Sequence, residues 1–190
     1  MKYVVSATGI IILVSVLALA YYGLFARVVI EEREMGGFVL VYENHKGPYQ
    51  EVGGIIEKIY SSLLGEYNVT GSKGFGLYYD DPQAVRKEDL RSIAGCILDG
   101  EDAGSSAYIG GRYKTATYPR SKSVTAEFPF RGTPSIFLGI LKVYPKLKEH
   151  MDKNGYPPVP IMEIYDSSNR KIIYVASVTL EGEVYNDFLK

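Results

Sequence analysis

The sequence predicts an α+β protein in which an N-terminal transmembrane helix precedes a domain made of two strand-helix-strand-strand units. Three observations support this prediction: a long uncharged apolar stretch, several short segments with the alternation of strands, and two amphipathic helical segments at matching places in the two halves. We accordingly divide the chain into an anchor (3–26), a juxtamembrane linker (27–37), the duplicated domain (38–180) and a short C-terminal tail (181–190).

Residues 3–26 contain no charged residue and no histidine. As a helix at about 1.5 Å per residue they would be roughly 36 Å long, enough to cross a hydrocarbon core of about 30 Å. Tyr21 and Tyr22, followed by Arg27, resemble an interfacial aromatic belt with a charged stop. A signal peptide cleaved after Ala18-Leu19-Ala20 is the alternative, but its apolar region would normally span only about 7–15 residues. We therefore expect an uncleaved anchor whose partner is the lipid bilayer.

The first half of the domain has one strand, one helix and two further strands. Residues 38–43 (FVLVYE) read as a strand, and Pro48 suits the first turn of a helix because its missing N–H is unpaired there anyway. Apolar residues then recur at helical spacing over 49–64. Residues 74–80 and 92–98 are the two predicted strands that follow.

The second half repeats this order after a loop that its Gly- and Ser-rich composition predicts over 100–111. A further strand over 113–118 leads into it. A second helix begins at Thr133 and Pro134, a plausible N-cap followed by a proline at the first helical position. The strands predicted for this half are 123–130, 159–166 and 171–178. Internal duplication is the simplest explanation, and it predicts a cleft between the two halves.

Composition argues against several classes of function. Leaving aside Lys2 and Arg27, which flank the anchor, 19 of the 21 basic residues remain against 22 acidic ones, without a Lys/Arg run, so we expect no nucleic-acid binding. One cysteine permits no internal disulfide. Two histidines and one cysteine far apart do not have the spacing of a zinc site, so we expect no metal and no cofactor.

Glu163 is the most informative candidate site residue. Strand alternation places Glu163 and Tyr165 on one face and Met162 and Ile164 on the other. We expect the apolar pair to lie on the face that the helices cover, so that Glu163 points into the cleft between the halves. A carboxylate among tyrosines suits a cationic or amphipathic ligand, and it could also act as a general acid or base. A solvated carboxylate on an open face is the alternative.

The matching strand of the first half supplies two more candidates. Tyr79 occupies the position that corresponds to Tyr165, and Leu77 the position that corresponds to Glu163. We expect both to border the same cleft, and ordinary cross-strand packing is the alternative for the tyrosines.

The segment Val41-Tyr42-Glu43-Asn44-His45-Lys46-Gly47-Pro48-Tyr49, with the strand Met162-Glu163-Ile164-Tyr165, resembles the GyrI-like (gyrase-inhibitor-like) small-molecule-binding domain. The resemblance implies two strand-helix-strand-strand units and a ligand cleft lined by aromatics around a carboxylate at Glu163. It adds Tyr42 and Tyr49 to the expected ligand-binding residues, beside Glu163, Tyr165, Tyr79 and Leu77.

A second resemblance covers nearly all of residues 3–178. The segments 77–82, 91–98 and 123–130 (SVTAEFPF) are similar to the family of testis-expressed ER-phagy receptors. This implies a single-pass protein of the endoplasmic reticulum with its domain facing the cytosol. Those receptors act through a long C-terminal tail, whereas only residues 181–190 follow the predicted domain here.

We therefore expect a membrane-anchored GyrI-like domain that binds a small molecule or a protein partner without catalysis. One alternative is an adaptor at the endoplasmic reticulum membrane, similar to an ER-phagy receptor. The second is a hydrolase of small electrophilic compounds that uses Glu163 as its catalytic group.

Overall fold

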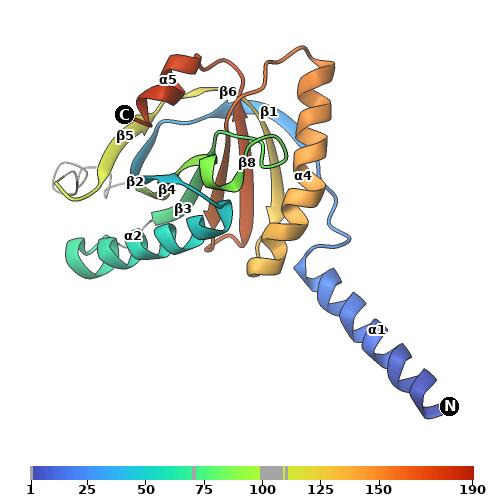
Figure 1. Cartoon of the computed structure of the whole chain (residues 1–190). Coiled ribbons are helices and arrows are strands. Elements are labelled where there is room, and N and C mark those ends of the chain that lie inside the picture. The colour runs from blue at the N-terminus through green and yellow to red at the C-terminus, as the bar shows by residue number, and fades with distance from the viewer. Residues whose placement is uncertain (1, 70–71, 99–108, 110) are drawn as a thin grey trace.

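The computed structural model describes residues 2–69, 72–98, 109 and 111–190 (Figure 1). The predicted loop 100–111 lies almost entirely outside the described residues. The α-helices are α1 (Lys2–Tyr22), α2 (Val52–Tyr67), α4 (Thr133–Lys153) and α5 (Gly182–Asp187), and short 3-10 turns cover Tyr49–Glu51 and Lys87–Asp89. The strands are β1 (Ile30–Met35), β2 (Phe38–Lys46), β3 (Ser72–Tyr78), β4 (Arg91–Leu98), β5 (Lys114–Tyr118), β6 (Ser121–Pro129), β7 (Ile161–Asp166) and β8 (Lys171–Ser177).

In the described residues these strands form one curled, eight-stranded antiparallel sheet in the order β1-β6-β8-β7-β3-β4-β2-β5. The units β2-α2-β3-β4 and β6-α4-β7-β8 meet where β3 pairs with β7 at the centre of the sheet. Each unit is preceded by a strand that pairs with the other unit: β1 pairs with β6, and β5 pairs with β2. The two halves are therefore interlocked through their edge strands.

Both faces of the sheet are covered. On one face α2 packs over β2, β3 and β4, while α4 packs over β1, β6 and β8 (Figure 1). The opposite face holds a separate apolar cluster that includes Leu77, Met162 and Ile164, and the C-terminal residues Tyr185 and Phe188 complete it. Alternate residues of the central strands are thus buried on both sides, which is why these strands have few exposed positions.

The predicted transmembrane helix is the main correction to the expected fold. Within the described residues, none of the helices combines the length and apolar character needed to cross a membrane. The uncharged stretch was predicted to be helical up to Ala26, but α1 ends at Tyr22, and Gly23 has a φ of 113°. Lys142 of α4 hydrogen-bonds the carbonyl oxygens of Leu24 and Ala26. The end of the apolar stretch therefore belongs to the folded domain rather than to a membrane-crossing helix.

Two further segments differ from their sequence-based interpretation. Residues 27–37, interpreted as a linker, contain strand β1 and the buried side chain of Val28. Residues 181–190, interpreted as a tail, contain α5, and Tyr185 and Phe188 are only 3% and 4% exposed. Both segments are integral parts of the sheet and its core.

Candidate functional site

Glu163 lies at the centre of the sheet, on the face that α2 and α4 cover. It pairs with Gly76 of β3 on one side and with Tyr174 of β8 on the other. Its relative exposure is 2%. Because cross-strand partners point to the same face, Gly76 and Tyr174 share this face with Glu163.

Two tyrosine hydroxyls donate to the carboxylate. Tyr144 of α4 donates to Oε1 and Tyr165 of β7 donates to Oε2, each at 2.7 Å. The hydroxyls of Tyr78 and Tyr165 lie 3.2 Å apart, and because Tyr165 uses its only proton on Glu163, Tyr78 is the donor. Tyr78 and Tyr165 therefore form a hydrogen-bonded chain that ends on one carboxylate oxygen, and Tyr144 donates to the other oxygen.

Glycine makes room for this arrangement on β3. A Cβ at Gly76 would lie 2.6 Å from the hydroxyl oxygen of Tyr78 and 2.8 Å from its ring carbon Cζ. The Tyr78 ring thus folds back over a position that has no side chain, and it packs edge-on against Tyr49 at 4.8 Å between ring centroids. The space above the centre of the sheet is filled by tyrosine rings in this structure.

The Glu163 carboxylate has an unusual electrostatic environment. Burial raises its pKa, and the two phenol hydrogen bonds counteract part of that effect. In the described part of the chain, no Lys, Arg or His forms an ion pair with it. Burial also raises the pKa of Tyr49 to about 12 and the pKa values of Tyr144 and Tyr165 well above their ordinary range. The phenols are therefore neutral donors at physiological pH.

Tyr174 adds a polar group that is not hydrogen-bonded. It is fully buried beneath α4, and its hydroxyl has no partner among the described atoms. Its ring packs edge-on against Tyr144, with centroids 5.8 Å apart. We use the name Glu163 site for Glu163 together with Tyr78, Tyr144, Tyr165 and Tyr174.

The sequence-based assignment of faces was reversed. Met162 and Ile164 face the cluster completed by the C-terminal residues, and Glu163 faces the helices. Leu77 and Tyr42 belong to the cluster of Met162, and the Tyr79 hydroxyl donates to the carbonyl oxygen of Tyr185 at 2.8 Å. These three predicted site residues therefore lie on the other side of the sheet from Glu163.

The structure brings together the remaining predicted residues and adds others. Glu163 and Tyr165 are in direct contact, and Tyr49 reaches the site through Tyr78. Tyr78, Tyr144 and Tyr174 were not among the site residues predicted from the sequence. Alternation placed Tyr78 on the face opposite Tyr79, and because Tyr79 was expected beside Glu163, this pattern did not point to Tyr78.

Two surface hollows lie elsewhere. One, of about 520 Å³, is lined by residues that include Tyr42 and Tyr113; the other, of about 530 Å³, is lined by residues that include Tyr21, Arg131 and Arg170. Neither borders Glu163, and because that side chain is only 2% exposed, the Glu163 site is closed in this structure.

Two interlocked β-α-β-β units and a buried, tyrosine-capped carboxylate between them define a class of small, pseudo-symmetric α+β domains. The model of the GyrI-like small molecule binding domain matches residues 29–185, and the chain belongs to this family.

Comparison with individual proteins gives more distant relationships. The chain is similar to Testis-expressed protein 264 of Homo sapiens, with 27% identity over 185 residues, covering 93% of this chain and 56% of that protein. It is also 27% identical over 152 residues to the Mus musculus homolog, covering 77% and 47% of the two chains. The chain thus spans about half the length of these curated relatives.

Among solved structures, the chain is similar to the EcmrR C-terminal domain, with a TM-score of 0.52 and 13% identity over 78% of this chain and 94% of that one. EcmrR in a complex with DNA gives a TM-score of 0.54 at 13% identity, covering 79% and 57% of the two chains. At this identity the likeness concerns the fold alone.

Proposed function

We propose that this domain binds a small organic cation with an aromatic or apolar body, without converting it, and that Glu163 contacts the positive charge. The observation that supports this proposal is a buried carboxylate whose described hydrogen-bond partners are two phenols and which forms no described ion pair. A buried carboxylate is costly unless it is paired. A ligand cation would supply the opposite charge.

The surrounding side chains suit the rest of such a ligand. Tyrosine rings present apolar area and faces that attract cations, and their hydroxyls accept or donate hydrogen bonds. Tyr144 and Tyr165 donate one hydrogen bond to each carboxylate oxygen, and because Glu163 is only 2% exposed, a ligand can reach it only when the covering tyrosine rings move aside. Membership of a small-molecule-binding family supports a ligand of this size.

Calorimetric titration with phenyltrimethylammonium tests the proposal. Its neutral isostere, tert-butylbenzene, has the same shape without the charge and should bind at least ten-fold more weakly. The Glu163→Gln variant should lose at least about ten-fold in affinity for the cation, because removing one partner of a buried charge pair costs about 2–5 kcal/mol. Glu149→Gln, an exposed substitution on α4, is the matched control and should bind as the unmodified chain does.

The pH dependence gives a second readout. Cation binding requires the ionised carboxylate, so the affinity should fall as the pH is lowered through the raised pKa of Glu163. The Glu163→Gln variant should lack this pH dependence. Equal binding of the cation and its isostere, or an unchanged affinity in Glu163→Gln, would show that the carboxylate is not the recognition element.

A further inference from the structure

The segment of residues 21–32 runs alongside α4 and enters the sheet with the first residues of β1, and we call it the N-terminal strap (Figure 1). Polar side chains of α4, and Arg131 two residues before it, attach this strap at successive points along the helix. Arg131 Nη1 donates to Tyr21 O at 2.5 Å, Ser135 Oγ to Tyr22 O at 3.0 Å, Lys142 Nζ to Leu24 O and Ala26 O at 2.5 and 2.7 Å, and Lys146 Nζ to Val28 O at 3.2 Å.

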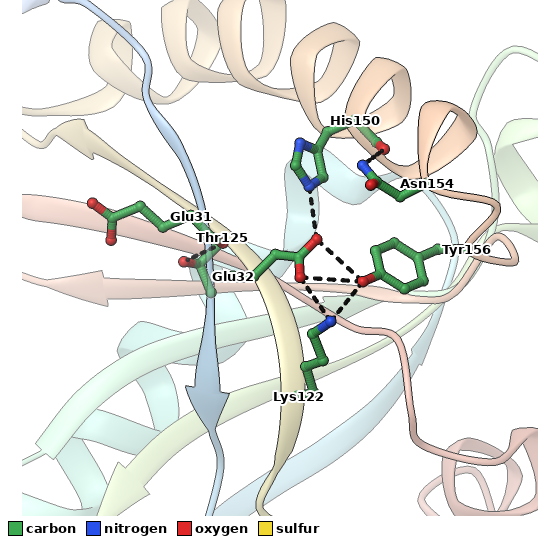
Figure 2. Close-up of polar contacts among 7 residues, drawn as sticks. All are labelled: Glu31, Glu32, Lys122, Thr125, His150, Asn154 and Tyr156. Carbon is green, nitrogen blue, oxygen red and sulfur yellow. Dashed lines mark hydrogen bonds and ion pairs between the residues drawn. The ribbon is translucent and has the colours of Figure 1, made fainter.

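The last point of attachment is a polar cluster at the end of α4. Figure 2 shows Glu32 of β1 between three side chains: His150 Nε2 lies 3.0 Å from Oε1, Lys122 Nζ 2.7 Å from Oε2, and the Tyr156 hydroxyl donates to Oε1 at 3.1 Å. Lys122 also donates to the Tyr156 hydroxyl at 2.7 Å. Strand β1, the C-terminal end of α4 and the connection to β7 are therefore joined through one carboxylate.

These attachments share one flank of the helix. Ser135, Lys142, Lys146 and His150 are separated by seven, four and four positions, the spacing of a single stripe on an α-helix. Tyr144 lies two positions from both Lys142 and Lys146, so it points from the opposite flank. The strap holds one side of α4, and the other side places the hydroxyl that covers Glu163.

We propose that the N-terminal strap is a clamp that keeps the Glu163 site closed, and that Lys142 and Lys146 are its positioning residues. They touch no carboxylate of the site; they hold α4 so that Tyr144 stays on Glu163. As far as ligand entry is concerned, this inference rests on the function proposed above.

The argument for a clamp follows from burial. Glu163 is 2% exposed, so a ligand reaches it only in a conformation in which the covering tyrosines have moved. The apparent affinity of a ligand is reduced by the fraction of molecules that are open. Weakening the clamp raises that fraction, and it should increase both the mobility of α4 and the apparent affinity for a ligand.

The double variant Lys142→Met/Lys146→Met tests this in the full chain. Methionine keeps the apolar stem of lysine and removes the ammonium group that donates to the strap. Lys148→Met/Lys153→Met is the matched control, because it removes the same charge from the same helix at side chains that bond to Asp152 and Glu149 instead.

Hydrogen–deuterium exchange of the unliganded proteins is measured first. In the clamp variant, the amides of α4 should exchange about ten-fold faster than in the control, because charge-assisted hydrogen bonds are lost, while those of β8 remain unchanged. Phenyltrimethylammonium should then bind faster and about ten-fold more tightly to the clamp variant.

The other possible outcomes each contradict one part of the proposals. Equal α4 exchange in the two double variants overturns the clamp, and so does faster exchange in both α4 and β8, which indicates a general loss of stability. Faster α4 exchange with unchanged cation affinity overturns the link between clamp and site. Faster α4 exchange with no cation binding to any of the proteins refutes the proposed function and leaves the mechanical role of the strap standing.

Discussion

Gly139 lies where α4 approaches the sheet closely, and replacing it with alanine should force the two apart. A Cβ at this position would lie 3.2 Å from Tyr174 Cζ and 3.4 Å from Phe128 Cδ1, and closer still to the Tyr174 hydroxyl oxygen. Tyr174 is fully buried and cannot turn aside into solvent. Overpacking of this kind costs about 1–3 kcal/mol, against a gain of up to about 1 kcal/mol in helix propensity. We expect Gly139→Ala to lower the free energy of unfolding by about 2 kcal/mol.

Tyr174→Phe should relieve much of that cost. The substitution removes the atom nearest to the new methyl group, together with a buried hydroxyl that has no described partner. Alone it should leave stability unchanged or raise it by about 1 kcal/mol. In the double variant the two effects should be non-additive by at least about 1 kcal/mol.

Urea denaturation followed by far-UV circular dichroism measures the four members of this cycle. Gly54→Ala on α2 is the control, because a Cβ there meets nothing within 4 Å, and it should be neutral or stabilising by up to about 1 kcal/mol. Additive effects of Gly139→Ala and Tyr174→Phe would refute the close contact between α4 and the ring of Tyr174.

Three further predictions concern stability. Hydrogen bonds, above all from Lys122, lower the pKa of Glu32 to about 2. The stability that they provide is therefore present above pH 4.5 and is lost as the pH falls from about 4.5 to 2. In the Glu32→Gln variant, the urea midpoint of unfolding should depend less on pH in that window. Gly36 has a φ of 116° and lies against the backbone of the β5–β6 connection, so Gly36→Ala should cost about 3 kcal/mol or more in urea denaturation. The Tyr49 hydroxyl donates to Asp80 O at 2.9 Å and accepts from Asp80 N at 3.0 Å, so Tyr49→Phe should lower the thermal midpoint through a loss of about 1–2 kcal/mol. These contacts would be contradicted if the urea midpoint of Glu32→Gln depended on pH as strongly as that of the unmodified chain, or if either of the other variants had unchanged stability.

Residue periodicity was informative where a segment has one polar and one apolar side. The amphipathic segments predicted as helices correspond to α2 and α4, and the strands predicted over 92–98 and 171–178 correspond to β4 and β8 within a residue. Strand β1, with the sequence IEEREM, was missed. It is an edge strand that pairs on one side only, and its charged side chains reach solvent, so it lacks the apolar alternation of an inner strand.

The site was harder to predict because both faces of the central strands are buried. Alternation separates Glu163 from Met162, but it does not tell which of two covered faces the helices occupy. Treating Leu77 as the counterpart of Glu163 also placed the two on one face, whereas in the sheet Glu163 pairs with Gly76 and Leu77 pairs with Met162. A one-residue slip moves every side chain to the other face, which accounts for the misplacement of Leu77 and Tyr79 together.

The exchange of edge strands between the two halves has a consequence for how the protein is made. Ile30 pairs with Ala126, so strand β1 leaves the ribosome long before the strand that receives it. The first half cannot complete its own hydrogen bonding during synthesis, and a nascent chain ending near residue 120 would still present an unpaired edge. Folding to the native state should therefore be a late, cooperative event that awaits the synthesis of β6, rather than a sequence of two independent steps.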